Sequence, residues 1–176
     1  MTNAIVDKGT LERIDGDKWR LHFRRRFGHA PEKVWRAVTE PEHLAAWFPH
    51  EIHGDFTPGA CLRFTSKDMP DFEFEGKVLA CDPPRLLEFT WGTDTLRFEI
   101  ESDGDGSVFT LFDTIDELGK AARDGAGWHA CLDALAAHLD ERAAPEGRWK
   151  QVHPDYVATF GPEASTIGPP EGHPEA

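Results

Sequence analysis

The sequence has few cysteines and few basic residues for its length, and it contains no long apolar run. Its three cysteines, Cys61, Cys81 and Cys131, are widely spaced and form no C-x-x-C pair, so neither a disulfide scaffold nor a zinc site is indicated. Nineteen Lys and Arg stand against thirty-two Asp and Glu, and the formal net charge of -13 disfavours binding to nucleic acid or to an anionic membrane. No apolar segment approaches the roughly 18 residues that a membrane-spanning helix requires. These absences favour an acidic globular protein without a membrane span.

The length of 176 residues is that of one ordinary domain. We predict a main domain over residues 1–145 and a short helix over 146–160, docked on the body because Tyr156 and Phe160 are spaced i, i+4. Residues 161–176 are rich in Gly, Pro and Glu, and they predict a flexible tail. The first residues lack the basic and then apolar order of a signal peptide, and the cysteine spacing suits a reducing compartment, so we expect a cytoplasmic protein.

Alternating apolar and polar residues predict antiparallel strands through much of the chain. Segments 10–15 and 19–27 flank a turn at 16–18, which is typical of a hairpin. From residue 61 the apolar positions recur every second residue. The sets that share a face are Leu62 and Phe64; Phe72, Phe74 and Val78; Leu87, Phe89 and Trp91; and Leu96, Phe98 and Ile100. A last strand is predicted at 107–114, so the strands should form one antiparallel meander.

Two short helices are predicted after the hairpin, near 30–38 and 41–47, and a long one follows the last strand. In the long helix one apolar stripe is formed by Trp128, Cys131, Leu132, Leu135 and Leu139. This order predicts the α+β class and a helix-grip fold, in which a curved antiparallel sheet wraps around the long C-terminal helix. A hollow is expected between sheet and helix.

Residues 29–48, HAPEKVWRAVTEPEHLAAWF, and residues 127–135, GWHACLDAL, carry a family resemblance. They resemble the START-like or SRPBCC superfamily, and more narrowly its bacterial branch related to the activator of the ninety-kilodalton heat-shock-protein ATPase. Segments 58–59, 74–78 and 83–91 fit the same pattern, so the likeness covers about residues 11–142. The resemblance implies a helix-grip fold with a cavity lined mainly by apolar side chains. It does not imply one activity, because the superfamily includes carriers, receptors, cyclases and co-chaperones.

Aromatic side chains are the main candidates for ligand contact, because aromatic walls are usual in ligand pockets. The predicted ligand-binding residues are Trp47, Phe48, Phe64, Phe74, Trp91, Phe98, Asp113, Trp128 and Leu132. The aromatic members would all face inward by the alternation and the helical stripe, and an ordinary core is the alternative for each of them.

Asp113 has two readings. If Phe109 and Leu111 face inward, Asp113 does so too and could anchor a ligand; if Val108 and Phe112 do, it is a surface charge. No triad with a nucleophile elbow, phosphate loop or redox dithiol is present, so we predict no catalytic residue and no cofactor. His50 and His53 lie near each other, but their spacing matches no metal motif, and no metal is predicted.

Three functional hypotheses remain, in decreasing order of support. The first is a module that binds a small, largely apolar ligand in the cavity. The second is a co-chaperone-like module whose acidic surface docks a chaperone or another protein. The third is a pocket enzyme of the cyclase or hydrolase type, with Asp113 or His129 as the acid–base group.

Overall fold

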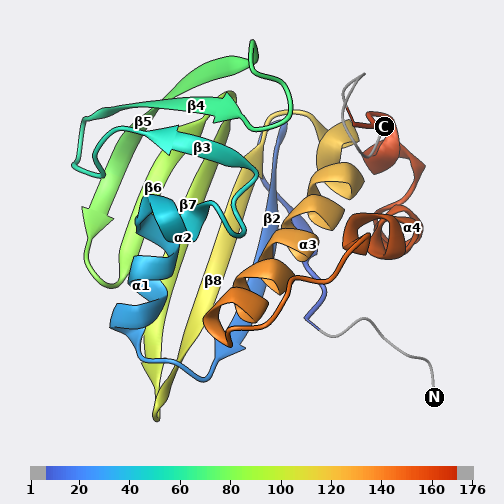
Figure 1. The fold of residues 1–176 in the computed structure, drawn as a ribbon. Helices are drawn as coiled ribbons and strands as arrows, with labels where there is room; N and C mark the ends of the chain where they lie inside the picture. Colours follow the sequence, from blue (N-terminus) through green and yellow to red (C-terminus); the bar gives the residue numbers. More distant parts are fainter. Residues whose placement is uncertain (1–6, 170–176) are drawn as a thin grey trace, which may run out of the picture.

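The computed structural model describes residues 7–169, and its centre is one antiparallel sheet of eight strands in the order β1-β2-β8-β7-β6-β5-β4-β3. The strands are β1 (Thr10–Asp15), β2 (Lys18–Phe27), β3 (His50–His53), β4 (Cys61–Ser66), β5 (Glu73–Asp82), β6 (Leu86–Trp91), β7 (Asp94–Asp103) and β8 (Gly106–Ile115). The sheet curves so that β3, β4 and β5 lie over one end of the long helix α3 (Figure 1). The predicted α+β helix-grip fold is confirmed.

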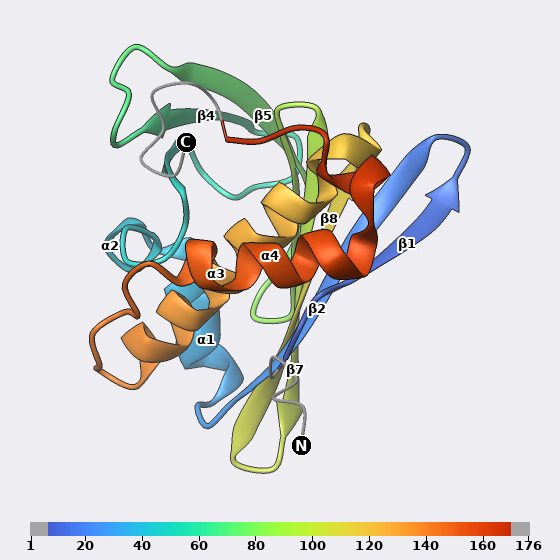
Figure 2. The ribbon, with the colours of Figure 1, turned by 90° about the vertical axis from the view of Figure 1, so that its right-hand side faces the viewer.

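Helices cover the concave face of this sheet (Figure 1). They are α1 (Pro31–Thr39), α2 (Pro41–Leu44), α3 (Ala121–Leu139) and α4 (Arg148–Phe160), with short 3-10 turns η1 (Leu118–Lys120) and η2 (Pro162–Ser165). No helix within residues 7–169 has the length and apolar character needed to cross a membrane. Helix α4 lies on the far side of α3 from the sheet, so α3 is packed on two sides (Figure 2).

Side-chain alternation explains which face of each strand is buried. On β7, Leu96, Phe98 and Ile100 are buried, while Arg97 and Glu99 between them are partly exposed. β8 resolves the alternative that the sequence left open, because Phe109, Leu111, Asp113 and Ile115 face the interior. A carboxylate therefore stands in an otherwise apolar row.

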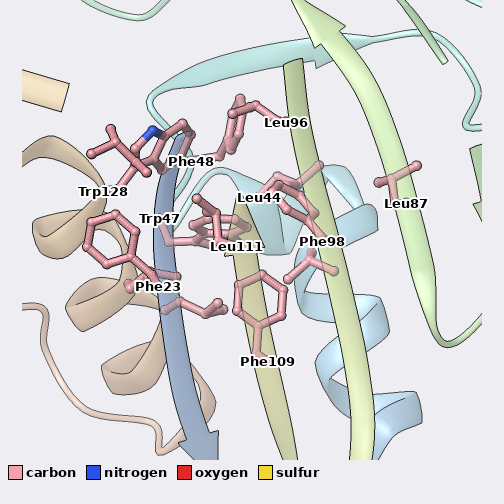
Figure 3. Packing of buried hydrophobic residues seen from close by; sticks show 14 of the residues in the cluster. Phe23, Leu44, Trp47, Phe48, Leu87, Leu96, Phe98, Phe109, Leu111 and Trp128 are labelled. Carbon is pink, nitrogen blue, oxygen red and sulfur yellow. The ribbon is translucent and has the colours of Figure 1, made fainter. Parts of the chain in front are cut away.

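The space beneath the middle of α3 is filled by side chains rather than hollow (Figure 3). The Phe48 ring lies with its centroid 5.8 Å from that of Trp128, and the Trp47 ring lies 5.9 Å from that of Phe98. Phe64, Phe98 and Leu132 are fully buried in the same cluster. An apolar cluster of this extent is the main source of stability in a domain of this size.

The close packing of α4 on α3 depends on small residues. A Cβ atom on Gly125 would lie 3.1 Å from a ring carbon of Tyr156, so the glycine lets the two helices approach. The α4 side chains that are buried here are Trp149, Val152 and Tyr156. A helix over 146–160 docked on the body was a prediction from the sequence, and the structure has α4 in this position.

The chain after α4 also lies against the body. The sequence predicts a flexible tail over 161–176, whereas Ala164 in η2 is buried and the Ile167 N–H donates to the Gly119 carbonyl at 3.1 Å. The apolar side chain of Ala164 and this hydrogen bond supply contacts that composition does not reveal. Residues 170–176, the end of the predicted tail, lie outside the described residues.

Candidate functional site

A pocket of about 620 Å³ lies at the end of α3 where the sheet curls over it. Its walls come from the start of β3, the turn between β4 and β5, the turn between β6 and β7, the first half of α3, and α4. Exposed residues such as Asp68, Phe72 and Glu73 form part of its rim, so the pocket opens to solvent. The cavity expected under the whole long helix is therefore a pocket at one end of it.

Aromatic rings form one wall of the pocket. The Trp91 and Trp128 ring centroids are 5.3 Å apart with their planes at 54°, and Phe74 lies 6.0 Å from Trp91 with its plane at 64°. Phe72 continues the wall, 5.7 Å from Phe74. Phe72 meets Phe74, and Phe74 meets Trp91, in edge-to-face contacts that help to orient the rings of this wall.

Acidic side chains gather beside the aromatic wall. Asp94 at the start of β7, Asp113 on β8 and Asp124 on α3 each bring a carboxylate oxygen within 4.8 Å of the others. Asp94 and Asp124 line the pocket, whereas Asp113 is completely buried behind it. The Trp128 indole N–H donates to Asp113 Oδ2 at 2.8 Å, which joins the acidic cluster to the aromatic wall.

Asp113 is the most perturbed group of this cluster. Burial raises its pKa well above the ordinary value, and the negative charges of Asp94 and Asp124 raise it further, while Trp128 and Lys120 act in the opposite direction. Its Oδ1 atom has no hydrogen-bond partner among residues 7–169. A buried carboxyl in this setting is most stable in the neutral, protonated form.

Two basic side chains offset part of the negative charge. Lys120 Nζ donates to Asp94 Oδ1 at 3.0 Å and to Asp116 Oδ1 at 2.9 Å, and Arg123 Nε lies 2.6 Å from Asp124 Oδ1.

The pKa values of this group show that the compensation is incomplete. Burial would lower the pKa of Lys120, but the hydrogen bonds from its ammonium to Asp116 and Asp94 outweigh it and raise the value to about 12. Even so, burial raises the pKa of Asp94 to about 6.

The nine residues predicted to bind ligand divide into two groups. Phe74, Trp91 and Trp128 line the pocket. The others, which lie in the interior and outside the pocket lining, are Trp47, Phe48, Phe64, Phe98, Asp113 and Leu132. Phe48 and Asp113 touch the wall from behind, through the ring and the indole N–H of Trp128.

His129 was one of the two acid–base groups considered for a pocket enzyme, but its side chain does not reach the pocket. Its ring is fully buried against α4, with Nδ1 2.8 Å from Tyr156 Oη, and it is not among the residues that line the pocket. Successive residues of a helix point about 100° apart, so Trp128 faces the pocket and His129 faces α4, a helix that the apolar stripe does not reveal.

Sequence reasoning did not single out Asp94, Lys120 or Asp124. A usable signal exists for Asp94, because it continues the alternation of Leu96 and Phe98 toward the interior. Lys120 and Asp124 are spaced i, i+4, but only the fold brings them to the turn between β6 and β7.

Comparisons with known proteins agree with this fold. The family model described as activator of Hsp90 ATPase homolog 1-like protein matches residues 29–140. A conserved protein of unknown function from Enterococcus faecalis, EF2215, is 22% identical with a TM-score of 0.74, over 87% of this chain and 90% of that one. CalU16 from Micromonospora echinospora is 23% identical with a TM-score of 0.71, over 88% and 96%. The protein encoded by BPP1335 from Bordetella parapertussis is 25% identical with a TM-score of 0.65, over 87% and 91%. No curated protein matches the sequence.

Proposed function

The chain belongs to the family of activator of Hsp90 ATPase homolog 1-like proteins, and we propose that it binds a small, largely apolar molecule in the pocket at the end of α3. The observation that carries this proposal is the aromatic wall of Phe72, Phe74, Trp91 and Trp128 along a pocket of about 620 Å³. Ligand pockets are commonly about 300–1,000 Å³, with aromatic walls and a few polar groups that fix orientation.

The apolar body of the ligand would lie against Phe72, Phe74 and Trp91, where it replaces water at ring surfaces, while the buried Trp128 supports Trp91 from behind. Removal of apolar surface from water supplies about 25 cal/mol per Å², and this burial would be the main driving force for binding. The Trp91 indole Nε1 is buried and has no acceptor among residues 7–169. An oxygen or nitrogen of the ligand could accept this N–H and orient the molecule in the pocket.

Binding of a neutral apolar dye tests the proposal. N-phenyl-1-naphthylamine should become strongly fluorescent with the wild-type protein and bind about 10-fold more weakly to Trp91→Ala, because one aromatic contact surface is lost. Phe112→Ala is the matched control, since this ring stacks on His22 and is absent from the pocket lining. Equal affinity of Trp91→Ala and the wild-type protein would contradict the proposal, as would no binding to either.

A second candidate is a role on a chaperone, and the description of the matched family, which names an activator of the Hsp90 ATPase, favours it. The acidic protein, with a formal charge of -13, would dock a basic face of its partner. The test is the rate of ATP hydrolysis by purified Hsp90 with and without this protein, at low and high salt. An electrostatic activator should raise the rate most at low salt, and no change at low salt would contradict this candidate.

A further inference from the structure

The charged side chains of the pocket lining are mostly acidic. Among the lining residues, carboxylates are supplied by Asp68, Glu73, Asp94 and Asp124, and the Lys and Arg side chains are Lys120 and Arg123. Both basic side chains are already engaged, Lys120 with Asp94 and Asp116 and Arg123 with Asp124. Lys120 is shared between two carboxylates, and Glu73 is paired with Arg63 at 3.3 Å, so the lining carries more carboxylates than basic side chains.

A buried carboxyl behind the lining adds a second and independent observation. Asp113 has no exposed surface, and its Oδ1 atom lacks a hydrogen-bond partner in the described part of the chain. Its carboxylate belongs to the group whose oxygens lie within 4.8 Å of one another, together with Asp94 and Asp124. A positive charge placed near the cluster would favour the ionised form of this carboxyl and of its two neighbours.

The aromatic wall has the matching property. The faces of aromatic rings carry partial negative charge, and a cation within about 6 Å of a ring centroid is attracted to it. Trp91 and Phe74 are only partly buried, and their ring centroids are 6.0 Å apart, so a cationic group in the pocket can lie close to both rings. Asp124 and Asp94 border the same pocket.

Building on the proposed function, we propose that the ligand of this pocket carries a protonated or quaternary amine, with its apolar groups against Phe74 and Trp91 and its positive charge beside Asp94 and Asp124. The acidic character of the whole chain would raise the local concentration of such a ligand. The amine supplies the positive charge that Lys120 and Arg123 leave missing. No covalent step is involved.

A pair of probes of the same shape separates charge from apolar contact. Phenyltrimethylammonium and tert-butylbenzene differ in a positively charged nitrogen against a neutral carbon, and both can be titrated against the indole N–H resonances of the protein. The indole N–H resonances of Trp91 and Trp128 can be assigned by substituting each residue in turn. Both resonances should shift when either probe binds. We expect the cation to bind about 10-fold more tightly, chiefly because its charge is attracted to the carboxylates of Asp94 and Asp124.

Variants identify the carboxylates that are responsible. Asp124→Asn and, separately, Asp94→Asn should remove most of the preference for the cation while leaving the affinity for tert-butylbenzene within about twofold, which also shows that each variant is folded. Glu101→Gln is the matched control, because it removes one negative charge from an exposed site outside the pocket lining. It should leave the preference unchanged.

The outcomes distinguish this inference from the function on which it rests. Equal binding of the two probes, or tighter binding of tert-butylbenzene, would overturn the amine proposal and leave the apolar pocket standing. Binding of neither probe would overturn both. A preference for the cation that survives both Asn variants would also overturn the inference, since the charge would then be recognised elsewhere.

Discussion

Protonation of His129 should destabilise the protein in mild acid. The ring lies fully buried between α3 and α4, with Nδ1 2.8 Å from Tyr156 Oη. Because Tyr156 Oη already accepts the Gly9 N–H at 2.9 Å, its own hydrogen can be donated to Nδ1, and the imidazole is then neutral with its proton on Nε2. A second proton would bind to Nδ1. The nitrogen that accepts the Tyr156 hydroxyl would then become a donor, and this hydrogen bond would be lost.

The size of the effect follows from the pKa of the ring. Burial, with the nearby positive charge of Arg25, lowers the pKa of His129 from 6.5 to about 4. In the unfolded chain the ring takes up its proton below about pH 6.5, but in the folded protein it does so only near pH 4. The contribution of the neutral His129 ring to the unfolding free energy is therefore fully present above pH 6.5 and is lost as the pH falls toward 4. Each unit of pKa is worth about 1.36 kcal/mol, which gives a full loss of about 3 kcal/mol, of which about 2.5 kcal/mol has occurred at pH 4.5.

Urea unfolding at pH 7.0 and pH 4.5 measures this loss. Asp94, whose pKa is raised to about 6 by burial, contributes stability with the opposite dependence over the same range, because it is protonated more readily in the folded protein. The wild-type protein is therefore compared with His129→Gln, since the contribution of Asp94 is common to both. The decrease in unfolding free energy between the two pH values should be about 2.5 kcal/mol smaller in the variant.

His53→Gln is the control, because His53 is exposed on β3. It should show the same decrease as the wild-type protein. If His129→Gln also loses as much free energy as the wild-type protein, the buried neutral imidazole is refuted.

Asp133→Asn should lower the urea unfolding free energy by about 3–5 kcal/mol, because the buried guanidinium of Arg25 loses its carboxylate partner at 2.8 Å; a loss below 1 kcal/mol would contradict this. Gly127→Ala should raise the urea unfolding free energy by up to about 1 kcal/mol, since the nearest atom to the added methyl group among residues 7–169 is Trp149 Cδ1 at 4.0 Å. Gly125→Ala is its matched partner and should show no such gain, because its methyl would lie 3.1 Å from a ring carbon of α4; equal gains would refute the close packing. Asp113→Asn should be at least as stable as the wild-type protein at pH 7, because the amide oxygen still accepts the indole N–H, whereas Asp113→Leu should lose about 1–3 kcal/mol.

Strands with one buried face could be predicted closely from the sequence, because their alternation has a period of two. The short strand β3, with the sequence HEIH, has only one apolar residue and gave no such signal. The long helix was recognised from its stripe at Trp128, but α3 begins at Ala121. The first turns of α3 consist largely of small buried residues, including Ala122 and Ala126. Small residues give only a weak contrast with their polar neighbours, so these turns show no clear apolar stripe.

The candidate site could be predicted only in part, and for a physical reason. Trp91 and Trp128 were predicted to face the interior and do border the pocket. The orientation of Asp113 could not be decided, because both faces of β8 carry large apolar residues, and Phe112 on the outer face is accommodated by stacking on His22. The acidic cluster contains residues from β7, β8 and α3, which are far apart in the sequence. A local sequence pattern therefore cannot predict that their carboxylates lie close together.

The pocket and the pH-sensitive contact at His129 share one structural element. The family match ends at residue 140, but Trp149 of α4 lies in the pocket wall, and its indole N–H donates to the Arg123 carbonyl at 3.0 Å. The hydrogen bond between His129 and Tyr156 holds the same helix against α3. Protonation of His129 should therefore disturb α4 and the pocket wall together. The affinity for a neutral dye should fall over the same pH range as the stability in the wild-type protein, and it should fall less in His129→Gln.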